Sequence, residues 1–180
     1  MLSELQKRKL TALFHHQDTN GDGFLEKADY ERYMEKFAQV QNFAPDSPRY
    51  QAVYGQTMAA WEQTQKIADQ DGDGRASLDE FLASWDITLG DEKLFEQLAI
   101  GYYRSLLDMW DRDGDGRLSG VEYIAFLGCY GVPEEAAREA FQHLDRKANG
   151  YLSAEELLQA AREFLGSDPD APGNWIAGPY

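Results

Sequence analysis

Three segments of the chain repeat one arrangement of oxygen-bearing residues that could hold a hard divalent cation. In the third segment, positions 1, 3, 5, 6, 7, 9 and 12 are Asp111, Asp113, Asp115, Gly116, Arg117, Ser119 and Glu122. Such a cation takes about six to eight oxygen ligands, and a short loop supplies them when alternate residues point inward. Glycine at position 6 makes the sharp turn, position 7 gives its backbone carbonyl, and the last carboxylate closes the shell. The segment therefore predicts a divalent-cation site.

The same template fits the chain at three further places. The first loop has Asp18, Asn20, Asp22, Gly23, Phe24, Glu26 and Asp29 at these positions; the second has Asp69, Asp71, Asp73, Gly74, Arg75, Ser77 and Glu80; the fourth has Asp145, Lys147, Asn149, Gly150, Tyr151, Ser153 and Glu156. Four loops with the glycine in register are not plausible as chance matches in an acidic chain. Their spacing is that of the EF-hand calcium loop.

The first three loops carry the predicted metal ligands. Loops two and three each have three aspartates and a terminal glutamate, so both are predicted to bind Ca²⁺, and their arginines at position 7 offer only backbone carbonyls. The predicted ligands are Asp18, Asn20, Asp22, Phe24, Asp29, Asp69, Asp71, Asp73, Arg75, Glu80, Asp111, Asp113, Asp115, Arg117 and Glu122. We therefore expect about three bound calcium ions.

Loops one and four depart from this pattern in different ways. Loop one ends in Asp29, which is one methylene shorter than glutamate and reaches an ion less easily with both oxygens. Lower coordination suits the smaller, octahedral Mg²⁺, so we expect this loop to bind Ca²⁺ more weakly and Mg²⁺ relatively better. Loop four has Lys147 at position 3, whose ammonium group has no lone pair and repels a cation. We predict that loop four binds no metal.

Helical patterns flank every loop and would position its ligands. Ser3 and Gln6 suit a capping box at the start of the first helix, and Gly90 and Asp91 mark a break between two later helices. Apolar residues at helical spacing predict the buried faces, among them Tyr30, Tyr33, Met34, Phe37, Val53, Trp61, Phe81, Trp85, Leu94, Leu98, Tyr102, Leu106, Trp110, Val121, Ile124, Leu127, Phe141, Leu144, Leu157 and Leu165. The fold class is therefore all-α.

Position 8 of each loop is apolar: Leu25, Ala76, Leu118 and Leu152. In paired loops this residue makes a short strand contact, so loop one should pair with loop two, and loop three with loop four. We predict a compact domain of two pairs, over residues 1–89 and 90–165, followed by a tail over 166–180. The tail is rich in proline, glycine and aspartate but ends with Trp175, Ile176 and Tyr180, so we expect it to pack on the apolar core.

Composition limits the remaining possibilities. The formal net charge of −15 argues against nucleic acid and anionic membranes as partners. No apolar run approaches the roughly 20 residues of a membrane span, and no signal-peptide-like run follows the basic residues 7–9. The single cysteine, Cys129, excludes an internal disulfide and suits a buried position. We expect a cytoplasmic monomer without membrane insertion, and no transition-metal site at His15, His16 or His143.

The four loops, the long first connector and the tail resemble the sarcoplasmic calcium-binding proteins, and above all their bacterial calerythrin-like relatives. The segment from Asp168 to Trp175 is similar to tails of that bacterial group. The resemblance implies a cytosolic calcium buffer or signal modulator without catalysis. One feature differs, because the second loop is the silent one in calerythrin-like proteins, whereas here it is the fourth.

Three functions are compatible with this pattern. A buffer binds calcium tightly, at about 10⁻⁹–10⁻⁸ M, whereas a sensor works at about 10⁻⁷–10⁻⁵ M and exposes an apolar groove to a target protein. Sensors favour methionine-rich grooves, and this chain has four methionines, so we expect a buffer or modulator whose protein target, if it has one, the sequence does not identify. Calcium-triggered photoproteins share the four-loop plan but end in proline, whereas Tyr180 follows Pro179 here, so we expect no enzyme.

Overall fold

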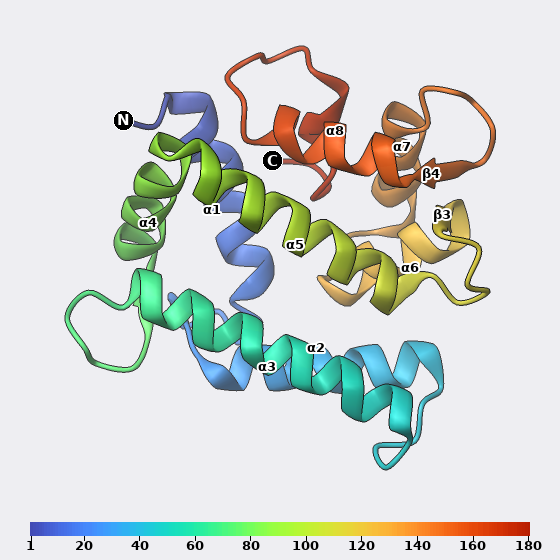
Figure 1. The fold of residues 1–180 in the computed structure, drawn as a ribbon, viewed down its shortest axis with the longest axis horizontal. Helices are drawn as coiled ribbons and strands as arrows, with labels where there is room; N and C mark the ends of the chain where they lie inside the picture. The colour runs from blue at the N-terminus through green and yellow to red at the C-terminus, as the bar shows by residue number, and fades with distance from the viewer.

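The computed structural model describes residues 1–180, with all side chains except those of residues 98–100 and 102–103. Its elements run in the order α1 (Glu4–Gln17), β1 (Phe24–Leu25), α2 (Lys27–Gln41), α3 (Pro48–Ala68), β2 (Ala76–Ser77), α4 (Leu78–Gly90), α5 (Glu92–Trp110), β3 (Arg117–Ser119), α6 (Gly120–Cys129), α7 (Glu134–Leu144), β4 (Tyr151–Ser153), α8 (Ala154–Phe164) and the 3₁₀ turn η1 (Pro172–Trp175). The chain is all-α, as predicted, with each loop between two helices (Figure 1).

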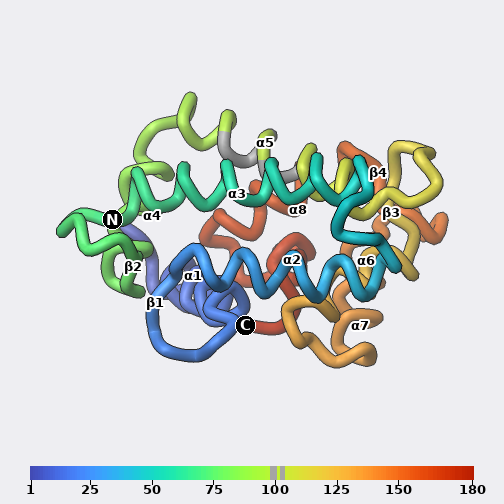
Figure 2. Tube along the Cα trace, turned by 90° about the horizontal axis from the view of Figure 1, so that it is seen from below, coloured from blue at the N-terminus to red at the C-terminus, as the bar shows by residue number. Residues whose placement is uncertain are grey.

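The short strands join the loops in the predicted pairs. β1 pairs antiparallel with β2, placing Leu25 opposite Ala76, and β3 pairs antiparallel with β4, placing Leu118 opposite Leu152. All four of these position-8 side chains are fully buried. The two strand pairs lie at opposite ends of the long axis of the molecule (Figure 2).

Local sequence signals set the helix ends. The capping box of Ser3 and Gln6 is present at α1, and Asp91 caps α5 through the backbone N–H groups of residues 93 and 94. Ser77, Ser119 and Ser153, at position 9 of their loops, each cap the helix that leaves the loop. The ends of the loops and the starts of the helices are therefore the same residues.

The core joins both pairs through aromatic contacts. Trp110 at the end of α5 is fully buried, donates a hydrogen bond to the Tyr33 hydroxyl at 3.2 Å, and packs edge-on against Phe37 of α2. Cys129 is buried, as expected, and burial raises the pKa of its thiol to about 11. No helix among the described residues is long and apolar enough to cross a membrane.

One predicted core position is wrong. Val121 is exposed (73%), although its spacing with Ile124 and Leu127 placed it on an inward face. Leu127 is buried, as predicted, but Tyr123 and Phe126 fill the rest of the inward face of α6 and leave Val121 outside it. Leu98 and Tyr102, which were also expected on an apolar face, lie outside the described side chains.

The tail packs on the core, as predicted. η1 lies against α8 and α7, Ile176 is buried, and the Tyr123 hydroxyl donates to the carbonyls of Ile176 (3.0 Å) and Trp175 (3.2 Å). The Trp175 ring stacks on His143 of α7, with ring centroids 4.4 Å apart. In Figure 1 the segment after α8 turns back beside that helix.

A buried lysine ties α1 to the tail. Lys9 is fully buried, and its ammonium donates to the Asn174 Oδ1 at 2.8 Å and to the Gly166 carbonyl at 2.9 Å. Burial lowers the pKa of Lys9 to about 8. A buried ammonium is tolerated only with such partners, so this contact fixes where the tail can dock.

Gly173 marks the closest approach of the tail to α8, and we expect Gly173→Ala to loosen this contact. A Cβ built there would lie 2.5 Å from the Ala160 carbonyl oxygen, so the substitution should destabilise the protein by about 1–3 kcal/mol. Thermal unfolding in calcium measures the change. The control is Gly55→Ala in α3, where a Cβ meets nothing and the melting temperature should stay equal or rise slightly. Equal melting temperatures for Gly173→Ala and wild type would contradict the expectation.

Candidate metal centres

The first aspartate of each loop holds the turn that surrounds the site. In loop two, Asp69 accepts the N–H of Gly72 through Oδ1 at 2.8 Å and the N–H of Gly74 through Oδ2 at 3.0 Å. Both glycines have positive φ values, of 76° and 88°, which a side chain would strain. Loops one and three repeat both bonds through Asp18 and Asp111.

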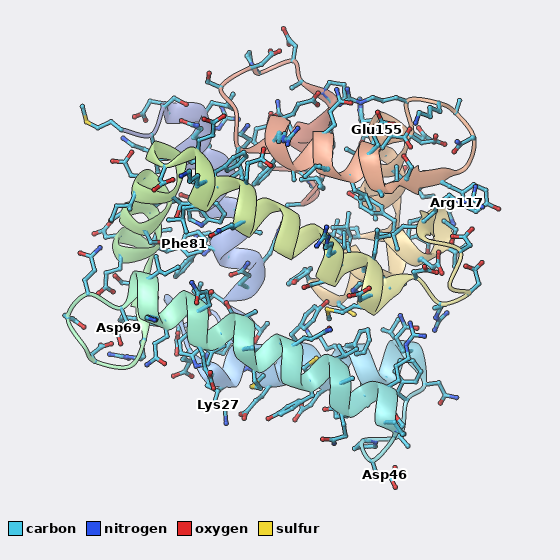
Figure 3. The ribbon with its side chains drawn as sticks, in the orientation of Figure 1. Lys27, Asp46, Asp69, Phe81, Arg117 and Glu155 are labelled. Carbon is cyan, nitrogen blue, oxygen red and sulfur yellow. The ribbon has the colours of Figure 1, made fainter. Side chains whose placement is uncertain are left out.

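Loops two and three each gather three carboxylates. One oxygen from each of Asp69, Asp71 and Asp73 lies within 4.8 Å of the others, and the same holds for Asp111, Asp113 and Asp115. A donor set made only of oxygens fits a hard cation such as Ca²⁺. Figure 3 shows Asp69 and Arg117 in loops at opposite ends of the molecule, so these two clusters are far apart.

The glutamate at position 12 connects both ends of its loop. Glu122 accepts the backbone N–H of Arg112 at 2.7 Å, and its other oxygen accepts the N–H and hydroxyl of Ser119 at 2.8 and 2.7 Å. Glu80 makes the equivalent bonds, and the Ser77 hydroxyl, with backbone N–H groups, lowers the pKa of Glu80 to about 2. Glu80 is therefore ionised and oriented at neutral pH.

Arginines at position 7 contact the neighbouring carboxylates, which the sequence analysis missed. The Arg75 guanidinium lies 3.0 Å from Asp73, and that of Arg117 lies 2.7 Å from Asp115. Arg75 also stacks over the Phe24 ring of the paired loop, at 4.0 Å from its centroid. The sequence signal was the aromatic residue at position 7 of the paired loop, Phe24 or Tyr151, whose ring contacts the arginine.

Loop one differs at its last ligand. The Asp29 side chain is fully buried, and its Oδ1 accepts the N–H and hydroxyl of Thr19, both at 3.0 Å, and lies 3.1 Å from the Arg32 guanidinium. Its Oδ2 accepts the N–H of Glu26 at 3.0 Å. The shorter aspartate thus makes the backbone contacts that glutamate makes in loops two and three. It also contacts the guanidinium of Arg32, which has no equivalent at the glutamates.

Loop four keeps the shape of the other loops with different contacts. Lys147 points to Glu155 at 3.2 Å, Arg146 pairs with Glu163 of α8, and Glu156 still accepts from Ser153. Ala148, at position 4, has a φ of 49°, where the other loops have glycine. The sequence analysis found the lysine but missed this alanine, although a non-glycine residue at position 4 was visible.

The two pairs also meet at loop three. The Arg112 guanidinium donates to the Val40 carbonyl at 2.9 Å and to the Gln41 side chain, both at the end of α2. Arg49 of α3 donates to the Asp111 carbonyl at 2.8 Å. The end of α2 and the start of α3 therefore hold loop three against the other pair.

A cavity of about 410 Å³ lies between the two pairs, and the sequence did not predict it. Aromatic side chains such as Tyr30, Phe81 and Trp85 line it together with neutral polar residues of α1, α3 and α5. Asp29 is the one charged residue among the lining side chains that the structure describes. The volume of the cavity is typical of small-molecule sites.

Comparisons with known proteins agree with this geometry. A family model described as an EF-hand domain matches residues 136–166. Calerythrin of Saccharopolyspora erythraea is 28% identical over 171 residues, which cover 91% of this chain and 94% of calerythrin. The luciferin-binding protein of Renilla reniformis is 28% identical over 88% of this chain and 84% of its own. The solved structure of a Streptomyces coelicolor calcium-binding protein, from work on prokaryotic calcium-mediated regulation, is 30% identical, with a TM-score of 0.74 over 91% of this chain and 99% of its own.

Converting loop four into a metal site should require two changes. Lys147→Asp restores an oxygen ligand, and Ala148→Gly removes the strain of a positive φ at position 4. We expect Lys147→Asp with Ala148→Gly to add one calcium-binding event in titration calorimetry, and Ala148→Gly alone to add none. No additional event in the double variant would mean that the pairing of Arg146 with Glu163 also disables the loop.

Proposed function

The chain belongs to the calerythrin-like EF-hand calcium-binding proteins, and from this we propose that it binds Ca²⁺ in loops one to three and acts as a cytoplasmic calcium buffer or modulator. The observation that carries the proposal is the pair of three-aspartate clusters in loops two and three. Both sit in loops whose turn and closing glutamate are already oriented by hydrogen bonds. Calerythrin and the Streptomyces coelicolor protein are calcium-binding proteins rather than enzymes, which supports a function without catalysis.

We further propose that the fourth loop is a packing partner and not a metal site. Its lysine is engaged with Glu155, and its strand β4 completes the ladder of loop three. Residues 1–89 and 90–165 then form two pairs of unequal character, with all metal ligands of the second pair in loop three.

The docked tail favours a buffer or modulator over a sensor that grips a target helix. Ile176 and the ordered η1 already cover the apolar surface of α7 and α8. A target helix could reach that surface only by displacing the tail, which Lys9 and Tyr123 hold through hydrogen bonds. Regulation by calcium, as studied for the Streptomyces coelicolor protein, would in this chain act through calcium occupancy or through another surface.

We expect three calcium ions per chain in titration calorimetry, and two after either Glu80→Gln or Glu122→Gln. An amide at position 12 keeps the shape of glutamate but loses the charge that closes the shell. Glu156→Gln in loop four is the matched control, because Glu156 makes the same capping contacts and should leave the number at three. Fewer than three ions for the wild type, or a loss with Glu156→Gln, would contradict the assignment.

A second candidate function is the carriage of a small apolar molecule, because the cavity is large enough for one. The luciferin-binding protein among the relatives has a name that describes such a role for that protein. The described lining combines aromatic faces with neutral polar groups, which suits an uncharged aromatic ligand. Cavity binding and calcium binding can coexist in one chain.

The uncharged dye N-phenyl-1-naphthylamine separates carrier, sensor and simple buffer. A carrier binds one dye per chain. Gly101 of α5 lines the cavity, so the added side-chain volume in Gly101→Leu should weaken dye binding about tenfold. Gly55→Leu in α3 is the control, because that glycine has open space and does not line the cavity. Dye binding that appears only with calcium, and survives Gly101→Leu, would indicate a sensor groove. No dye binding in either state would exclude both alternatives to the buffer.

A further inference from the structure

The carboxylates at position 12 are held by different chemistry in loop one than in loops two and three. In loops two and three, each glutamate oxygen accepts only from neutral groups, namely backbone N–H groups and a serine hydroxyl. In loop one, the donors to Asp29 include the Arg32 guanidinium, a permanent cation.

The two carboxylate oxygens of Asp29 accept different numbers of hydrogen bonds. A carboxylate oxygen has about two lone-pair sites, and Oδ1 already faces three donors: the N–H of Thr19, its hydroxyl, and Arg32. Oδ2 accepts a single N–H, that of Glu26. An incoming ion therefore finds one available oxygen on Asp29.

The contact between Arg32 and Asp29 differs from an ordinary surface ion pair between residues one helical turn apart. The Asp29 side chain is fully buried while that of Arg32 is 37% exposed, so the carboxylate meets the guanidinium from inside the loop. Arg32 Nε also donates to the Thr19 hydroxyl at 3.0 Å, so one guanidinium bridges positions 2 and 12 of loop one. Two such directed bonds fix the side chain far better than a single exposed contact.

We propose that Arg32 is the specificity-determining residue of loop one, because it occupies one oxygen of Asp29 and leaves the other as a single ligand for the ion. The proposal rests on metal binding by loop one, as proposed above. The sequence analysis attributed the ion preference of loop one to the short side chain of Asp29. The proposal adds Arg32, whose guanidinium binds one oxygen of that carboxylate.

The expected consequence is a change in ion preference. Ca²⁺ accepts up to about eight oxygens and gains from a two-oxygen carboxylate, whereas Mg²⁺ needs about six in a tight octahedron. Restricting Asp29 to one oxygen penalises Ca²⁺ more than Mg²⁺. Loops two and three lack this restriction, because releasing a serine hydroxyl from glutamate breaks no ion pair.

Site-resolved NMR titration of the full chain tests the proposal. The amides of Gly23, Gly74 and Gly116 lie at position 6 of loops one, two and three and report each loop separately. Arg32→Met keeps the aliphatic stem, and it should raise the Ca²⁺ affinity at Gly23 about tenfold, the size of one charge-assisted hydrogen bond, with a smaller rise for Mg²⁺. Unchanged titrations at Gly74 and Gly116 verify that the variant is folded.

Lys27→Met is the matched control. Lys27 lies on the same helix and pairs with Glu31 at 2.9 Å, with both side chains exposed, so this variant removes an equal charge without touching Asp29. We expect it to change both ion affinities at Gly23 by less than about twofold.

The outcomes separate the inference from its premise. A lower Ca²⁺ affinity in Arg32→Met, an equal rise for Ca²⁺ and Mg²⁺, or the same change in Lys27→Met would overturn the role of Arg32 while metal binding by loop one stands. A wild type in which Gly74 and Gly116 respond but Gly23 responds to neither ion would instead remove loop one from the metal sites. Silence at all three glycines would refute the proposed function itself.

Discussion

The carboxylate at position 12 of each loop is the interaction on which the rest of the structure depends. In loops one to three it accepts hydrogen bonds from the second and ninth residues of its loop, and in loop four from the third and ninth. It is also the third residue of the departing helix, where it completes the capping box. One side chain therefore closes the loop and starts the helix. Because the next residue, such as Phe81 or Tyr123, points into the core, the position of this carboxylate also sets how the helix packs.

Positive side chains lie beside the acidic loops, although the chain carries a net charge of −15. Arg32, Arg75 and Arg117 each contact a predicted ligand of their own loop, and Arg146 and Lys147 are paired within loop four and α8. These contacts reduce repulsion among carboxylates that would otherwise face one another. The partner of the arginine differs between loops. It is the aspartate at position 5 in loops two and three, and the aspartate at position 12 in loop one.

Sequence predicted what is encoded locally. Loop spacing, helix caps and strand partners such as Leu118 with Leu152 depend on neighbours within a few residues or on a repeated motif, and these are confirmed. The exposure of Val121 was not predictable in this way, because the inward face of α6 is set by Phe126 packing against Trp110 of α5 and by Tyr123 packing against Phe141 of α7. The bridge from Arg32 to Thr19 and the cavity likewise depend on side-chain directions and on helices far apart in the chain.

Loop four has a consequence for its neighbour. Its ion pairs and strand β4 hold a loop of the same shape as the others, in spite of the left-handed Ala148. The strand partner of loop three is thus held by ion pairs within the protein. Under the proposal that loop four binds no metal, its order does not depend on calcium concentration. Under the same proposal, loop four stays ordered when calcium leaves loop three, so rebinding the ion carries no entropy cost for ordering loop four again.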